Sequence, residues 1–97
     1  MMPQSVATIP TANARRYMVQ LCKHFGHKRP TSFDDATGSI DFDFGEAWMT
    51  ADENALTITA TALDEEGAAR LSRVMESHLK RFSFREPDLA FDWVAKA

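Results

Sequence analysis

The chain has 97 residues, of which 44% are hydrophobic, 26% charged and 10% aromatic, with only four glycines and four prolines. This length makes one domain over residues 1–97, since halves would be too small to bury cores of their own, and the composition excludes disordered, collagen-like and low-complexity chains. Eleven basic against fourteen acidic residues give a net charge of −3, which argues against a nucleic-acid partner, and no apolar run is long enough to cross a membrane.

The first part of the chain predicts a strand followed by a helix. Gln4–Ile9 places its residues alternately on two sides and is followed by Pro10, which indicates a short strand. Over residues 12–25 apolar side chains recur at three- and four-residue steps, which is typical of an amphipathic helix. We expect Thr11 to cap the start of this helix and Gly26 to end it as a C′ glycine.

A period of two then replaces the helical period. Strict alternation over residues 38–45 predicts a strand with its apolar side chains inward and two aspartates outward. A tight reversal at Gly45–Glu46, a strand over 47–51, a turn at 52–54 and an alternating strand over 55–63 complete a predicted antiparallel meander.

The last third predicts a helix and a strand. Asp64 is expected to cap a helix that ends near Ser83, and Pro87 separates it from the alternating segment Leu89–Trp93, interpreted as a C-terminal strand. The resulting order, β-α-β-β-β-α-β, predicts an α+β two-layer sandwich, with a mostly antiparallel sheet and two parallel helices on one face. The other face, rich in threonine, is expected to be wet or to pair with a partner.

Charge is distributed unevenly along the chain. Residues 1–31 hold five basic residues and no acidic one, whereas residues 32–66 hold ten acidic residues and no basic one. If successive elements alternate in direction, both helices end at the same end of the domain and bring all three histidines together there. The candidate ligand-binding residues at that end are His24, His27, Lys28, His78, Arg81, Arg85 and Glu86.

Two interpretations of this cluster stay open. Cations near helix C-termini commonly offset the helix dipole and bond to the last carbonyls; alternatively, the cluster forms a shared pocket for an anionic or metal-bound ligand. His78 falls in the middle of an apolar stripe, which predicts a neutral core ring with both nitrogens hydrogen-bonded or a proton-transfer role. His24 and His27 have no clear set of further ligands, so we expect neither a metal site nor a cofactor.

No recognised catalytic motif is present. The chain has no Ser-His-Asp spacing, G-x-S-x-G, glycine-rich phosphate loop, dinucleotide fingerprint or C-x-x-C. The single cysteine, Cys22, is expected to be a small buried hydrophobe; it excludes an internal disulfide framework and suits a reducing cytoplasm, where we expect the protein to lie. No secretory signal is expected, because the first residues lack an apolar stretch behind a basic start.

Several segments carry a family resemblance. They read A-T-I-P-T-A-N-A-R-R-Y (7–17), L-C-K-H-F-G-H-K (21–28), G-S-I-D-F-D-F-G (38–45), H-L-K-R-F-S-F-R-E-P (78–87) and F-D-W (91–93). Together, over nearly the whole chain, they resemble the bacterial domain-of-unknown-function family 2218. Its members are small stand-alone proteins, and related domains are attached to siderophore-interacting, flavin-dependent reductase-like proteins. The resemblance implies a link to iron or siderophore handling by association, and it supplies no catalytic residues.

Three functions remain in competition. The first is a non-enzymatic accessory or small-ligand-binding module that takes an anionic small molecule, such as an iron chelate, at the candidate site. The second is a structural or interaction domain whose open sheet face or C-terminal strand pairs with a second copy, as a homodimer, or with a siderophore-interacting reductase. The third is an enzyme with His78 or His24 as general base. The sequence shows no nucleophile or oxyanion-binding group to accompany either histidine.

Overall fold

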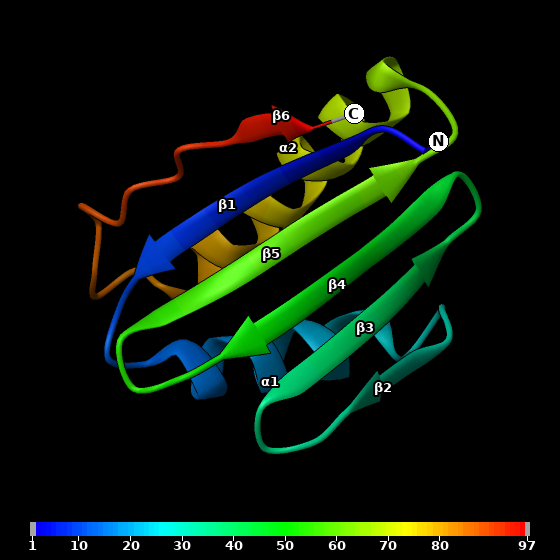
Figure 1. Ribbon diagram of the computed structural model, residues 1–97. Coiled ribbons are helices and arrows are strands. Elements are labelled where there is room, and N and C mark those ends of the chain that lie inside the picture. Colours follow the sequence, from blue (N-terminus) through cyan, green and yellow to red (C-terminus); the bar gives the residue numbers. More distant parts are fainter. Residues whose placement is uncertain (1, 97) are drawn as a thin grey trace.

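A computed structural model describes residues 2–96, which form one antiparallel sheet covered on one face by two helices (Figure 1). The elements in chain order are β1 (Gln4–Pro10), α1 (Ala14–Phe25), β2 (Thr31–Phe33), β3 (Thr37–Phe42), β4 (Gly45–Ala51), β5 (Ala55–Ala62), α2 (Glu65–Phe82) and β6 (Val94–Lys96). The strands lie in the order β2-β3-β4-β5-β1-β6, and all neighbours are antiparallel. The predicted α+β two-layer architecture with both helices on one face is therefore confirmed.

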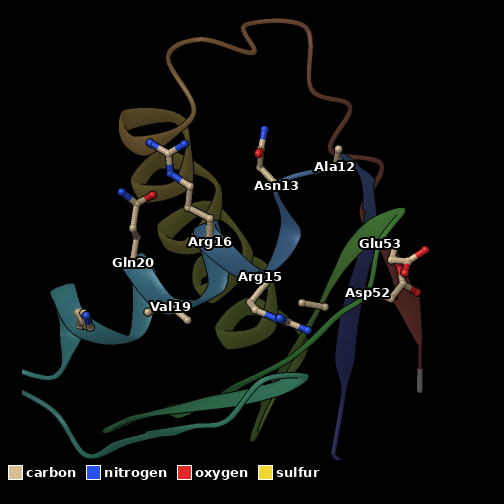
Figure 2. Close-up of a pocket in the computed structure, with 10 residues that line it drawn as sticks. Ala12, Asn13, Arg15, Arg16, Val19, Gln20, Asp52 and Glu53 are labelled. Carbon is tan, nitrogen blue, oxygen red and sulfur yellow. The ribbon is translucent and has the colours of Figure 1, made fainter.

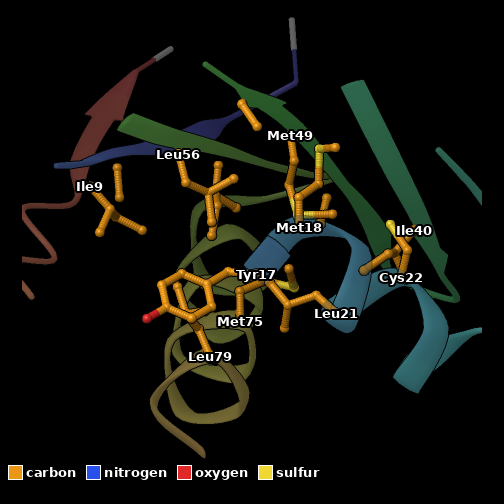
Figure 3. Packing of buried hydrophobic residues seen from close by; sticks show 14 of the residues in the cluster. Ile9, Tyr17, Met18, Leu21, Cys22, Ile40, Met49, Leu56, Met75 and Leu79 are labelled. Carbon is orange, nitrogen blue, oxygen red and sulfur yellow. The ribbon is translucent and has the colours of Figure 1, made fainter. Parts of the chain in front are cut away.

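The core lies between the sheet and the helices. In β5 the residues alternate between buried and half-buried along the whole strand, and the buried set faces α1 and α2 as the period of two predicts. The helices contribute large apolar side chains, among them Met18, Leu21, Met75 and Leu79, all fully buried in one cluster (Figure 3). Cys22 is buried in the same cluster, which confirms its predicted role as a small hydrophobe.

The two helices do not run parallel as predicted. Because β1 and β5 are antiparallel neighbours, with Pro10 opposite Ala55 and Gln4 opposite Thr61, α1 and α2 start at opposite ends of the sheet. Figure 1 shows them crossing the sheet in opposite senses. The error comes from β2, a three-residue strand that the sequence pattern did not reveal, because one additional strand reverses the direction of everything that follows it.

Two strand boundaries also differ from the prediction. The β3–β4 reversal lies at Asp43 and Phe44, since Phe42 already pairs with Gly45, so the predicted turn at Gly45–Glu46 is wrong. The C-terminal strand is β6, and not Leu89–Trp93. The alternation in that earlier segment reflects packing without strand pairing: its apolar side chains lie against the core cluster, and the Trp93 indole N–H donates to Glu76 at 2.8 Å.

The ends of α1 differ in detail from expectation. Asn13, and not Thr11, occupies the N-cap position, and its side chain makes no capping bond; the Thr11 hydroxyl accepts from the Asn13 backbone N–H at 3.0 Å. Gly26 follows the helix but has right-handed backbone angles, φ −62° and ψ −17°, so it is not a left-handed C′ glycine. The close approach of Thr31 better explains why residue 26 is a glycine, because a Cβ at this position would lie 3.0 Å from the Thr31 hydroxyl oxygen.

The predicted cap of α2 is confirmed and is testable. The Asp64 carboxylate accepts from the Gly67 backbone N–H at 2.7 Å. Asp64→Ala is expected to lower the free energy of unfolding by about 1 kcal/mol, measured by urea denaturation. Asp92→Ala, which removes an exposed aspartate outside both helices, serves as the control; equal stability of the two variants would contradict a capping role.

Within residues 2–96, neither helix has the length and apolar character that crossing a membrane requires.

Candidate functional site

Two of the three histidines meet on the helical layer. The rings of His24, in the last turn of α1, and His78, on α2, have centroids 5.2 Å apart. Phe25 and Phe82 complete the group, with ring centroids 4.8 Å from His78 and 5.7 Å from His24 respectively. The predicted proximity of His24 and His78 is thus present although the helices are not parallel. His78 lies four residues before Phe82, the last residue of α2, so the last turn of α1 meets α2 one turn before its end.

His78 lies at the border of the core and not in its middle. The buried residues of α2 are Ala68, Leu71, Ser72, Met75 and Leu79, and His78 is half-exposed. Its Nδ1 lies 2.7 Å from the Val74 carbonyl oxygen; since a carbonyl only accepts, Nδ1 carries the proton. In the neutral ring, Nε2 is then an acceptor, and no hydrogen-bond partner for it occurs among residues 2–96. The prediction of a buried ring satisfied at both nitrogens is wrong.

The surroundings of His24 are positive. Desolvation of its ring against its neighbours lowers the pKa of His24, and the positive charges of His78, Arg81, His27 and Lys28 lower it further. In the described chain, ion pairs within 4.0 Å join Arg29 to Asp43 and Lys80 to Glu76; neither Lys28 nor Arg81 takes part in one. We call His24, His27, Lys28, His78 and Arg81 the imidazole cluster.

Glu86 belongs to a different place. Its carboxylate accepts from the Thr11 hydroxyl at 3.0 and 3.1 Å, from the Asn13 side-chain amide at 2.8 Å, and from the Tyr17 hydroxyl. These donors stand at or just before the first turn of α1, seven to thirteen residues from His24 in the chain. The sequence singled out Glu86 but did not reveal its donors, which lie 69 to 75 residues away in the chain.

Arg85 also lies apart from the imidazole cluster in its contacts. Its guanidinium packs over the exposed Phe84 ring, 5.7 Å from the centroid. The seven predicted site residues therefore divide into the imidazole cluster and a pair beyond α2. The hydrogen bonds of Glu86 tie the chain after α2 to the start of α1, which is a structural role.

The imidazole cluster lacks the ligands of a metal site. Over the described range 2–96, no three His, Cys, Asp or Glu side chains are arranged to hold a metal ion. Cys22 is buried and burial raises the pKa of its thiol, which keeps it protonated and poorly nucleophilic. The side chains near His24 are cations and aromatic rings, which suit the binding of an anion.

Sequence reasoning missed a groove of about 690 Å³ between α1 and the β4–β5 turn. Figure 2 shows Arg15, Arg16 and Gln20 along α1, with Asp52 and Glu53 on the turn. Cations on one wall thus oppose carboxylates on the other, and the Arg15 Nε donates to the Asp35 carbonyl at 2.7 Å. Over residues 2–96, however, no ion pair within 4.0 Å joins the two walls. The basic spacing on α1 was visible in the sequence, but the opposing acids come from a different part of the chain.

One atom of the groove lacks a hydrogen-bond partner. Gln20 Oε1 is buried, and no donor in the described chain reaches it. Because Arg15, Arg16 and Lys23 also line it, the groove is the rival location for an anion in any binding experiment.

Comparison with known proteins agrees with the fold. The model of a family described as "Uncharacterized protein conserved in bacteria (DUF2218)" matches residues 6–94. The NMR structure of PA4090 from Pseudomonas aeruginosa is similar, with 27% sequence identity and a TM-score of 0.78 over 99% of this chain and 96% of that chain. No curated protein is significantly similar. The solved structure thus shares the architecture, and neither description names an activity.

Proposed function

The chain belongs to the DUF2218 family of uncharacterised bacterial proteins, and from that premise we propose that it is a non-enzymatic module that binds a small anionic molecule at the imidazole cluster. The single observation that carries the proposal is the contact of the His24 and His78 rings amid unpaired cations.

Electrostatics supports an anion as the ligand. Desolvation lowers the pKa of His24, and repulsion from the like charges around its ring lowers it further. A bound anion would reverse the effect, because negative charge favours the imidazolium form. Arg81 and Lys28 would supply charge-assisted hydrogen bonds, which are among the stronger polar contacts in proteins.

The surface position of the cluster supports binding without catalysis. His24, His27, Lys28 and Arg81 are exposed, so water reaches any ligand held there and no enclosed cavity would exclude it. The half-exposed rings of Phe25 and Phe82 offer a flat apolar wall beside the cations. This combination suits a planar or aromatic anion, such as a carboxylate or catecholate.

An iron chelate is the ligand class to test first. The resemblance to domains attached to siderophore-interacting reductases motivates this choice, and a reductase of that kind would be the matching partner. Ferric citrate, ferric tris-catecholate and metal-free citrate separate a chelate-specific site from a general carboxylate site.

The experiment is an NMR titration of the imidazole resonances with these three probes. The expected result is a rise in the pKa of His24 and shifts confined to the imidazole cluster, with binding that strengthens as pH falls. Arg81→Ala is expected to weaken binding about tenfold, the value of one charge-assisted hydrogen bond.

Arg73→Ala is the matched control, since Arg73 is an exposed arginine eight residues earlier on the same helix. Equal weakening by both variants would indicate nonspecific attraction of anions. Shifts centred on Arg15 and Gln20 would assign the ligand to the groove instead, and no shift with any probe would sink the proposal.

A further inference from the structure

We propose that the uncovered face of the sheet is the interface of a symmetric homodimer, in which β5 of one protomer packs over β5 of its partner. Figure 1 looks onto this face: both helices lie behind the sheet, and within residues 2–96 no element crosses in front of the strands. The strand register fixes which side chains share each row across this face.

One row of side chains across the open face of the sheet carries large exposed apolar residues at two positions. The register aligns Ser39, Trp48, Thr59, Val6 and Val94 across five strands from β3 to β6. These side chains point away from the helices, because their neighbours along each strand are the ones directed toward the core. Trp48 is 44% exposed and Val94 is 56% exposed, so the row presents large apolar groups on both sides of Thr59.

The adjacent row carries opposite charges at its two ends. It runs through Asp41, Glu46, Thr61, Gln4 and Lys96 on the same five strands. Asp41 and Glu46 are direct neighbours. Desolvation raises the pKa of Glu46, and its hydrogen bond with Asp41 and the charge of Asp41 raise it further. Among residues 2–96, this row has its two acidic side chains at one end and its lysine at the other, so the acidic end has no cation of the same row beside it.

A two-fold axis along β5 gives the apolar side chains of one row and the charged ends of the other row matching partners at the same time. Among the five strands from β3 to β6, β5 is central, so rotation by half a turn exchanges β3 with β6 and β4 with β1, and only β2 extends beyond the paired strands. Trp48 then packs over the partner's Val6, and Asp41 meets the partner's Lys96. An axis perpendicular to the strands would instead reverse the order of the rows and leave Lys96 without an acidic partner.

Chemistry of the face suits close packing of two sheets. The threonines of β5 at the centre are short and β-branched, so two sheets can approach to about 10 Å. Tryptophan is enriched at interface cores and charged residues are depleted there, and here the charged groups lie at the two ends of one row. A second copy places its lysine opposite the acidic end of the row and its acidic end opposite the lysine. An unrelated protein would need both charges at matching positions independently.

Analytical ultracentrifugation from micromolar to millimolar concentration tests the proposal. The wild-type chain is expected to form a dimer, and Trp48→Glu to raise its dissociation constant by about 100-fold or more, as loss of a central aromatic residue does. Phe84→Glu is the matched control, because Phe84 is 71% exposed and lies in the chain after α2, away from the strands of this face. Circular dichroism verifies that each variant is folded.

A charge exchange tests the orientation. Asp41→Lys alone and Lys96→Glu alone are each expected to weaken the dimer about tenfold, and the double variant to restore it, because both charge pairs recur across the two-fold axis. A monomeric wild-type chain overturns the proposal, as does a dimer insensitive to Trp48→Glu or a charge exchange without rescue. A monomer that uses Trp48 to hold a different protein also overturns it.

Discussion

Glu86→Ala is expected to lower the free energy of unfolding by about 3 kcal/mol, because one carboxylate accepts from three side chains that tie the start of α1 to the chain after α2. Thr11 and Tyr17 are buried, so the alanine variant leaves their hydroxyl donors without a partner in a dry environment. Chemical denaturation measures the loss.

Matched variants separate this effect from loss of charge alone. Glu53→Ala removes an exposed glutamate of the β4–β5 turn and is expected to change stability by less than about 0.5 kcal/mol. Tyr17→Phe removes one of the three donors and is expected to cost about 1 kcal/mol. Additivity of Tyr17→Phe and Glu86→Ala would contradict direct coupling of the two side chains.

The same carboxylate makes stability depend on pH. The hydrogen bond from Tyr17, followed by that from Asn13, lowers the pKa of Glu86 from its usual value of 4.5. Since the folded-state pKa lies below the unfolded one, the stabilisation is fully present above the unfolded value of about 4.5 and is lost as pH falls through the folded value. The stability difference between wild type and Glu86→Gln is therefore expected to narrow in acid, and a difference independent of pH would contradict this assignment.

Gly45→Ala is expected to destabilise the fold by about 2–3 kcal/mol through overpacking. A Cβ at this position would lie 2.3 Å from the Thr61 carbonyl oxygen and 3.2 Å from the Ala62 Cα. Both are backbone atoms of β5, so neither can rotate away, and the first residue of β4 must separate from its partner strand. Thermal and urea unfolding measure the effect.

Gly38→Ala provides the comparison for Gly45→Ala. A Cβ on residue 38 would meet the side chains of Cys22 and Met18 at 3.1 and 3.2 Å, and the flexible methionine can adjust. The loss in free energy of unfolding is therefore expected to be smaller for Gly38→Ala than for Gly45→Ala. The prediction for Gly45 fails if the two variants unfold alike.

The imidazole cluster illustrates how a site can be located by an argument that is partly wrong. His24 and His78 were expected to meet because both helices would end together; they meet because the last turn of α1 lies beside α2 one turn before its end. Arg85 and Glu86 were assigned to the same site on the assumption that the helices are parallel. That assumption failed at β2, and Glu86 is bonded at the start of α1 instead.

The amino-acid sequence by itself determined most of the local elements, β2 and β6 excepted, and most of the core. Alternation in β5, the helical period of α1 and the Asp64 cap depend on neighbours within a few residues, so their signals are complete in the chain. Only the tertiary structure decided the direction of the helices, the donors of Glu86 and the rows across the open sheet face. Each of these depends on strand count and register, which bring together residues far apart in sequence and leave no periodic signal in either segment.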